Sequence, residues 1–132
     1  MNVLIAHAFG RPWAAEAVSL LSRLPVSVHC SRTGEEALGL ASRGGLHVGI
    51  VDGDLPREGG LELVRRIRQT GSNLPCVLVC DNPNPQVLQD ALRLQVFSVL
   101  LAGSRRQSIV ETILKIGRQV YRLEWTEKKW VN

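Results

Sequence analysis

Cysteine is scarce in this sequence and odd in number, with only Cys30, Cys76 and Cys80. This small, odd number argues against a disulfide framework and favours a reducing compartment. The sequence also has no Cys-x-x-Cys pair. Apolar runs long enough to cross a bilayer are also lacking, as are the basic start and apolar stretch of a secretory signal. We therefore expect a cytoplasmic protein of 132 residues with one domain and a core of ordinary size.

Neither sign of charge is in excess over the first 102 residues, which carry nine basic and nine acidic side chains. The last thirty residues carry seven basic and three acidic side chains and so supply the whole net charge of +4. A basic segment of this kind suits an acidic partner, nucleic acid or simply a solvated helix face. Because no groove-reading motif accompanies it, we expect the solvated face and no nucleic acid partner for this domain.

Five short apolar segments alternate with five segments of helical periodicity. A Thr33-x-x-Glu36 capping box and Pro12 mark helix starts. Strand–helix alternation predicts an α/β fold, a five-stranded parallel sheet with helices on both faces, for which we expect the strand order 2-1-3-4-5. We expect residues 1–123 to form this domain and residues 124–132 to form a C-terminal extension or the start of a linker. The expected strands are residues 3–6, 26–30, 46–51, 76–80 and 97–101.

One carboxylate comes directly after the third apolar segment. Residues 48–51 are apolar or glycine, and Asp52 follows them. In open α/β sheets, ligands bind outside the carboxyl ends of the strands, where the strand order reverses. With the expected order, this point lies between the first and third strands. Asp52 is therefore expected to face His7 and Ala8 at the end of the first strand.

Several motifs together resemble the receiver domain of two-component response regulators. The resemblance covers about residues 2–122, and it rests on residues 33–38, 52–56, 60–63 and 74–75. It implies a flavodoxin-like fold and a role for Asp52 as the carboxylate that accepts a phosphoryl group from a histidine kinase. The resemblance also implies helpers that neutralise the charge of phosphoryl transfer, namely Mg²⁺ held by an acidic pair, a lysine and a hydroxyl.

The sequence departs from the family pattern at each helper position. The acidic pair falls on His7 and Ala8, the hydroxyl on Cys80, the lysine on Ala102 and the aromatic switch position on Val99. We therefore predict no catalytic residue, no cofactor and no metal site, beyond a weak association of Mg²⁺ with Asp52 and Asp54. The function that we predict is that of an atypical receiver in phosphorelay signal transduction, a protein-interaction module with impaired phosphorylation.

Two alternatives remain open from the sequence. The first is a conventional receiver that is phosphorylated on Asp52. The second is a small-molecule or redox sensor that uses the crevice around His7, Asp52 and Cys80. A protonated His7 paired with Asp52 would make that crevice sensitive to pH, whereas a neutral His7 bonded to a loop is the simpler interpretation.

The last predicted helix carries two apolar stripes where packing on one sheet needs about one. We assign the first stripe, which ends with Val120 and Leu123, to the sheet. The second stripe indicates either that a wide part of the helix surface faces the core of its own chain or that the helix contacts another chain. Two tryptophans in the charged tail favour such a contact, because aromatic residues are enriched at interfaces. We thus predict a homodimer through this helix, with Val110, Leu114, Tyr121, Trp125 and Trp130 at its interface.

Overall fold

The computed structural model describes residues 1–57, 59–104 and 107–124 of the chain. Strands and helices alternate along them, and each strand lies within two residues of the segment expected from the sequence. The elements are β1 (Asn2–Ala6), α1 (Pro12–Leu21), β2 (Ser27–Ser31), α2 (Gly34–Ser42), β3 (Val48–Asp52), α3 (Gly60–Gln69), β4 (Cys76–Cys80), α4 (Pro85–Arg93), β5 (Ser98–Leu101) and α5 (Gln107–Gln119).

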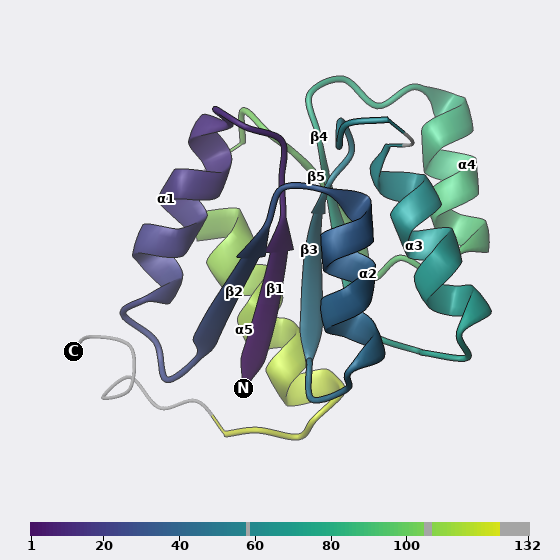
Figure 1. The fold of residues 1–132 in the computed structure, drawn as a ribbon. Coiled ribbons are helices and arrows are strands. Elements are labelled where there is room, and N and C mark those ends of the chain that lie inside the picture. The colour runs from purple at the N-terminus through teal and green to yellow at the C-terminus, as the bar shows by residue number, and fades with distance from the viewer. Residues whose placement is uncertain (58, 105–106, 125–132) are drawn as a thin grey trace.

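The five strands form one parallel sheet in the order β2-β1-β3-β4-β5 (Figure 1), which confirms the prediction. All five residues of β3 and of β4 are buried. Burial on both faces explains why these two strands read as nearly continuous apolar runs. β2 lies at an edge and exposes three of its five residues, which explains its more polar sequence.

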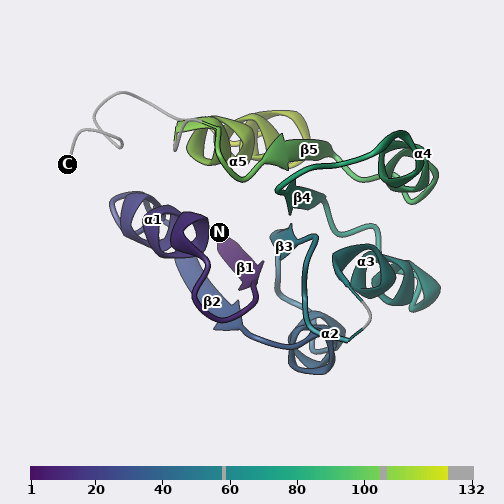
Figure 2. The same ribbon diagram turned by 90° about the horizontal axis from the view of Figure 1, so that it is seen from above.

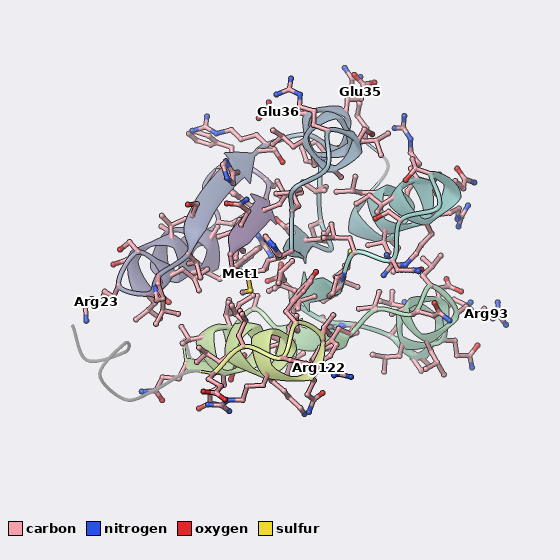
Figure 3. All side chains as sticks on the ribbon, turned by 90° about the horizontal axis from the view of Figure 1, so that it is seen from below. Met1, Arg23, Glu35, Glu36, Arg93 and Arg122 are labelled. Carbon is pink, nitrogen blue, oxygen red and sulfur yellow. The ribbon has the colours of Figure 1, made fainter. Side chains whose placement is uncertain are left out.

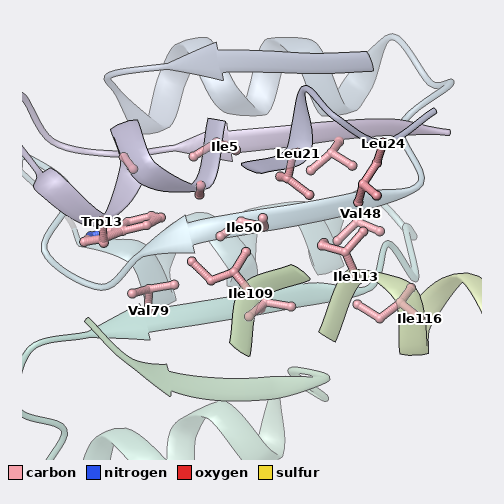
Figure 4. Packing of buried hydrophobic residues seen from close by; sticks show 14 of the residues in the cluster. Ile5, Trp13, Leu21, Leu24, Val48, Ile50, Val79, Ile109, Ile113 and Ile116 are labelled. Carbon is pink, nitrogen blue, oxygen red and sulfur yellow. The ribbon is translucent and has the colours of Figure 1, made fainter. Parts of the chain in front are cut away.

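Helices cover both faces of the sheet (Figure 2), with α1 and α5 on one face and α2, α3 and α4 on the other. Each face has its own hydrophobic cluster. On the α1 and α5 face, Ile5 and Ile50 of the sheet pack in the same cluster as Trp13 and Ile113 (Figure 4). Charged side chains lie around the outside of the molecule (Figure 3), among them Arg23, Glu35, Glu36, Arg93 and Arg122.

Local signals in the sequence explain where the helices begin. The Thr33 side chain accepts a hydrogen bond of 3.1 Å from the Glu36 backbone N–H, as the capping motif predicts. Asn84 caps α4 in the same way by accepting a bond of 2.9 Å from the Val87 N–H. Pro12 stands at the first position of α1, where a missing N–H costs nothing. Among the described residues, no helix is long and apolar enough to cross a membrane.

The second stripe of α5 contributes to the core of its own chain. Leu114 is 2% exposed, and Val110 and Tyr121 pack against the α1 and α5 cluster. The Tyr121 hydroxyl donates a 2.5 Å hydrogen bond to the His47 carbonyl. A wide part of the α5 surface therefore faces the core of its own chain. The assignment of Leu114 to an interface between copies was wrong.

The end of the first stripe also lies differently from the prediction. Val120 and Leu123, which we assigned to the sheet, are 45% and 39% exposed. The reason is that α5 ends at Gln119, so the helical spacing no longer applies to them. Trp125 and Trp130 lie outside the described residues, and their assignment to an interface stays a prediction.

Candidate functional site

Asp52 lies at the carboxyl end of β3 and is fully buried. The loop that follows is tied to the next strand, because the Gly53 N–H donates to the Val79 carbonyl at 2.8 Å. Gly60 begins α3 directly against Asp52, and a Cβ at Gly60 would stand 2.3 Å from the Asp52 carbonyl oxygen. A glycine at position 60 is therefore needed to bring α3 up to the acidic residue.

Both oxygens of the Asp52 carboxylate accept backbone hydrogen bonds. Oδ2 accepts from the Ala8 N–H at 3.0 Å, and Oδ1 accepts from the Asp54 N–H at 2.9 Å. The expectation that Asp52 faces the end of the first strand therefore holds for Ala8, which contributes its amide. A buried carboxylate needs such donors, because removing an unpaired charge from water is costly.

The cation beside Asp52 is the guanidinium of Arg11. Its Nε lies 3.2 Å from Asp52 Oδ2, its Nη2 lies 3.6 Å from Asp54 Oδ2, and its Nη1 donates a 2.8 Å hydrogen bond to Asp81 Oδ2. The Nε and Nη2 contacts are ion pairs without the alignment of hydrogen bonds. The Arg11 side chain is 20% exposed, so one largely buried cation joins three carboxylates from two strand ends.

The sequence around Arg11 explains its position. Gly10 has a φ of +76°, which an L side chain adopts rarely, and Pro12 begins α1 immediately afterwards. Arg11 is the N-cap residue of α1 in extended conformation, and its side chain makes no cap hydrogen bond. The turn and the helix start thus aim the guanidinium at the carboxyl ends of β3 and β4. Our sequence interpretation missed both Arg11 and Asp81 as site residues.

The pKa values of the Asp54 and Asp81 carboxyl groups shift in opposite directions. The pKa of Asp54 is raised above its ordinary 3.8 by burial first, then by a hydrogen bond with Asp81 and the nearby charge of Asp52. The pKa of Asp81 is lowered, mainly by its hydrogen bond from Arg11. One guanidinium therefore serves three acids incompletely, and Asp54 is the least well compensated.

The His7 side chain is bonded to a loop, which is the simpler of the two arrangements expected from the sequence. Its Nδ1 lies 2.9 Å from the Ala8 carbonyl, so this nitrogen is the donor, and its backbone N–H donates to the Ser31 carbonyl at 2.9 Å. The imidazole is thus bonded to its own loop. The alternative, in which a protonated His7 pairs with Asp52, is not the arrangement found, because the Arg11 guanidinium makes the ion pair with Asp52.

Cys80 and Ala102 stand at two of the family's helper positions without supplying the helpers' chemistry. Cys80 is 7% exposed, and a Cβ on Gly53 would lie 2.8 Å from its Sγ. Burial and the nearby acids raise the pKa of Cys80 to about 11, so the thiol stays protonated at neutral pH. Ala102 donates its N–H to the Cys80 carbonyl at 2.8 Å. A protonated, buried thiol argues against the redox-sensor alternative.

Solved structures of receiver domains share this fold. The receiver domain of an HD domain-containing protein from Pseudomonas fluorescens Pf-5 has a TM-score of 0.83 at 20% identity, with 92% of this chain and 98% of that chain covered. Chemotaxis protein CheY4 of Vibrio cholerae has a TM-score of 0.77 at 19% identity, covering 87% and 97%. The receiver domain of a modulated diguanylate cyclase from Desulfovibrio desulfuricans G20 has a TM-score of 0.77 at 26% identity, covering 92% and 98%.

A family model for the response regulator receiver domain matches residues 13–114. The chain therefore belongs to the response regulator receiver domain family, as its motifs indicated. The matched range begins within α1, after the segment that carries His7, Ala8 and Arg11. No curated protein matches this chain.

Membership of this family implies Mg²⁺ at the phosphorylation site, and the residues here do not fit that ion. Mg²⁺ requires near-octahedral oxygen coordination. Within the described ranges, no group of three acidic, histidine or cysteine residues is arranged to hold a metal. Ala8 offers an amide N–H to Asp52 instead of a carboxylate, and the Arg11 guanidinium already lies among the three acids.

Proposed function

We propose that this receiver domain is a protein-interaction module in two-component signalling, with impaired Mg²⁺-dependent phosphorylation of Asp52. The observation that carries the proposal is the burial and hydrogen bonding of the Asp52 carboxylate. Asp52 is fully buried, both of its oxygens accept backbone hydrogen bonds, and Arg11 lies against Oδ2. A carboxylate engaged in this way is a poor acceptor, because the phosphodonor must approach one of the same oxygens.

The groups around Asp52 also support impaired phosphorylation. Phosphoryl transfer depends almost entirely on positioning and on neutralising spread negative charge. Ala102 and Cys80 provide neither a cation nor a hydroxyl at the positions where the family has them. The charge of Arg11 is shared among three carboxylates, which leaves little of it for an incoming phosphoryl group.

We propose that the partners are signalling proteins, either a histidine kinase or an output protein. Exposed large apolar side chains on α4 and β5 support protein contact, because exposed apolar surface commonly marks interaction sites. Leu88 and Leu92 of α4 are 47% and 78% exposed, and Leu101 of β5 is 52% exposed. We keep the cytoplasm as the proposed location, on the strength of the sparse cysteine.

Intact-mass spectrometry tests the proposal directly. The protein is incubated with Mg²⁺ and acetyl phosphate, in parallel with a conventional receiver domain that confirms the donor is active. We expect no phosphate-sized mass gain under conditions that label the conventional domain. A gain that disappears in Asp52→Asn would instead establish a conventional receiver. A native preparation with a bound small molecule would favour the sensor alternative.

A further inference from the structure

We propose that Arg11 is an internal counter-ion that replaces the divalent cation of the receiver family, so that the carboxyl edge of the sheet is ordered without metal. This inference rests on the proposed function and explains it at the level of charge. It concerns the cation that compensates the carboxylates, whereas the proposed function concerns whether Asp52 is phosphorylated.

The need for a cation follows from burial. Asp52 is fully buried, and the Asp54 and Asp81 side chains, which are 61% and 55% exposed, lie beside it on the same guanidinium. A buried carboxylate is costly without a compensating positive charge, and two more carboxylates beside it add repulsion. In the described part of the chain, Arg11 is the cation that contacts all three acids, at 3.2, 3.6 and 2.8 Å.

The shape of the guanidinium suits this role. Arginine presents five N–H donors in a rigid planar fork, and its charge persists at every physiological pH. The three contacts to Asp52, Asp54 and Asp81 use three different nitrogens of that fork. A lysine at position 11 would bring a single compact ammonium, which contacts fewer of the acids at once.

The same arrangement excludes a divalent ion. A metal that approached Asp52 would meet the guanidinium, whose positive charge repels it at short range. Each Asp52 oxygen also already accepts one backbone hydrogen bond, from the Ala8 and Asp54 amides at 3.0 and 2.9 Å, which leaves fewer lone pairs for an ion. Binding of a metal therefore requires the guanidinium to be removed.

Thermal unfolding in the presence of metal tests the inference without any phosphodonor. The Tm of the wild type, Arg11→Ala and Arg11→Lys is measured in EDTA, in Mg²⁺ and in Mn²⁺. Arg93→Ala is the matched control, because Arg93 is 75% exposed and pairs only weakly with Asp90 at 3.8 Å. We expect the wild type and the control to be insensitive to both ions.

Removing the guanidinium should create dependence on the ion. We expect Arg11→Ala to have a lower Tm in EDTA and to regain about 5 °C in saturating Mn²⁺, since a ligand that binds only the folded state stabilises it. Asp81→Asn in the Arg11→Ala background should reduce that gain. Arg11→Lys should show a smaller gain, and it serves as the test if Arg11→Ala does not fold.

Two outcomes overturn the inference. One is a wild type that Mn²⁺ stabilises as much as it stabilises the Arg11 variants. The other is a folded Arg11 variant that gains no stability from either ion. The two proposals fail separately. A wild type that is phosphorylated yet insensitive to metal contradicts only the proposed function, and one stabilised by metal but never phosphorylated contradicts only the role of Arg11.

Discussion

At the scale of single residues, the carboxyl groups around Arg11 differ in how well each is compensated. Asp52 has two backbone donors and an ion pair, Asp81 has a direct hydrogen bond from Arg11, and Asp54 has the longest of the three contacts with Arg11. The raised pKa of Asp54 and the lowered pKa of Asp81 follow this ranking. Asp54 therefore opposes folding when ionised, whereas Asp81 favours it.

Replacing Asp54 should stabilise the protein at neutral pH. A group whose folded pKa is raised binds its proton more tightly in the folded state, so the folded state is penalised once the pH exceeds that value. We expect Asp54→Asn to raise the Tm at pH 7 and to lose that advantage below the ordinary aspartate pKa of 3.8, where both states are protonated. The effect should be small, because the Asp54 side chain is 61% exposed.

The check is a pair of melting curves, one at pH 7 and one at pH 3.5, for the wild type and Asp54→Asn. The substitution retains the backbone N–H that Asp52 accepts, so the geometry of the buried acid is preserved. A Tm that falls at pH 7 would mean that Arg11 compensates Asp54 better than its 3.6 Å contact indicates.

At the scale of elements, α3 can pack directly against Asp52 because Gly60, its first residue, has no side chain. Gly60→Ala places a Cβ 2.3 Å from the Asp52 carbonyl and 2.9 Å from Val51 Cγ1, inside fully buried structure. We expect a loss of about 2 kcal/mol or more in the free energy of unfolding, because backbone must move to make room. Urea unfolding measures the loss.

Gly39 provides the matched control for that substitution. It lies in α2, is exposed, and has no atom within 4 Å of an added Cβ. Gly39→Ala should therefore stabilise the protein by about 0.5–1 kcal/mol through helix propensity. A similar response at both positions would show that the crowding at Gly60 is relieved at little cost.

The role of α5 can be tested by truncating one residue from each part of its apolar surface. Leu114→Ala should cost about 2–5 kcal/mol, because Leu114 is 2% exposed in the core of its own chain. Val120→Ala should change the free energy of unfolding by no more than about 0.5 kcal/mol, because Val120 is 45% exposed and follows the end of the helix. Chemical denaturation at two protein concentrations separates folding from association, and equal costs would contradict the assignment.

At the scale of the whole molecule, the fold was predictable because its signals are local and periodic. Runs such as residues 76–80 are apolar on both faces, and the Thr33 capping box fixes a helix start. The strand order and the position of Asp52 follow from that alternation and from general rules of parallel sheets.

Arg11 could not be predicted in the same way. A guanidinium reaches several ångströms from its backbone, and its direction depends on a turn at Gly10 that leaves no periodic pattern. Its partners lie 41, 43 and 70 positions away in the sequence, as the numbers of Asp52, Asp54 and Asp81 show. The single available hint was a lone arginine beside the missing acidic pair, a charge of the opposite sign where the family has two carboxylates.

Association of whole molecules remains the open part of the sequence prediction. We propose a homodimer through the C-terminal segment, which the exposure of Val120 and Leu123 supports. Sedimentation velocity at high concentration should then show a dimer, and Leu123→Asp should shift it toward monomer. Leu92→Asp on α4 is the control for a general effect of added charge on an exposed leucine, and a monomer at every concentration would rule the dimer out.

The cation at this site is covalently part of the polypeptide, because it is the side chain of Arg11. Its local concentration is therefore fixed by the chain and does not follow the magnesium level of the cell. If Asp52 is not phosphorylated, as we propose, the domain carries no phosphoryl group to hydrolyse, and its signal lasts as long as a partner protein stays bound. Response times would then be set by the rates at which partner proteins bind and dissociate, rather than by the rate of autodephosphorylation.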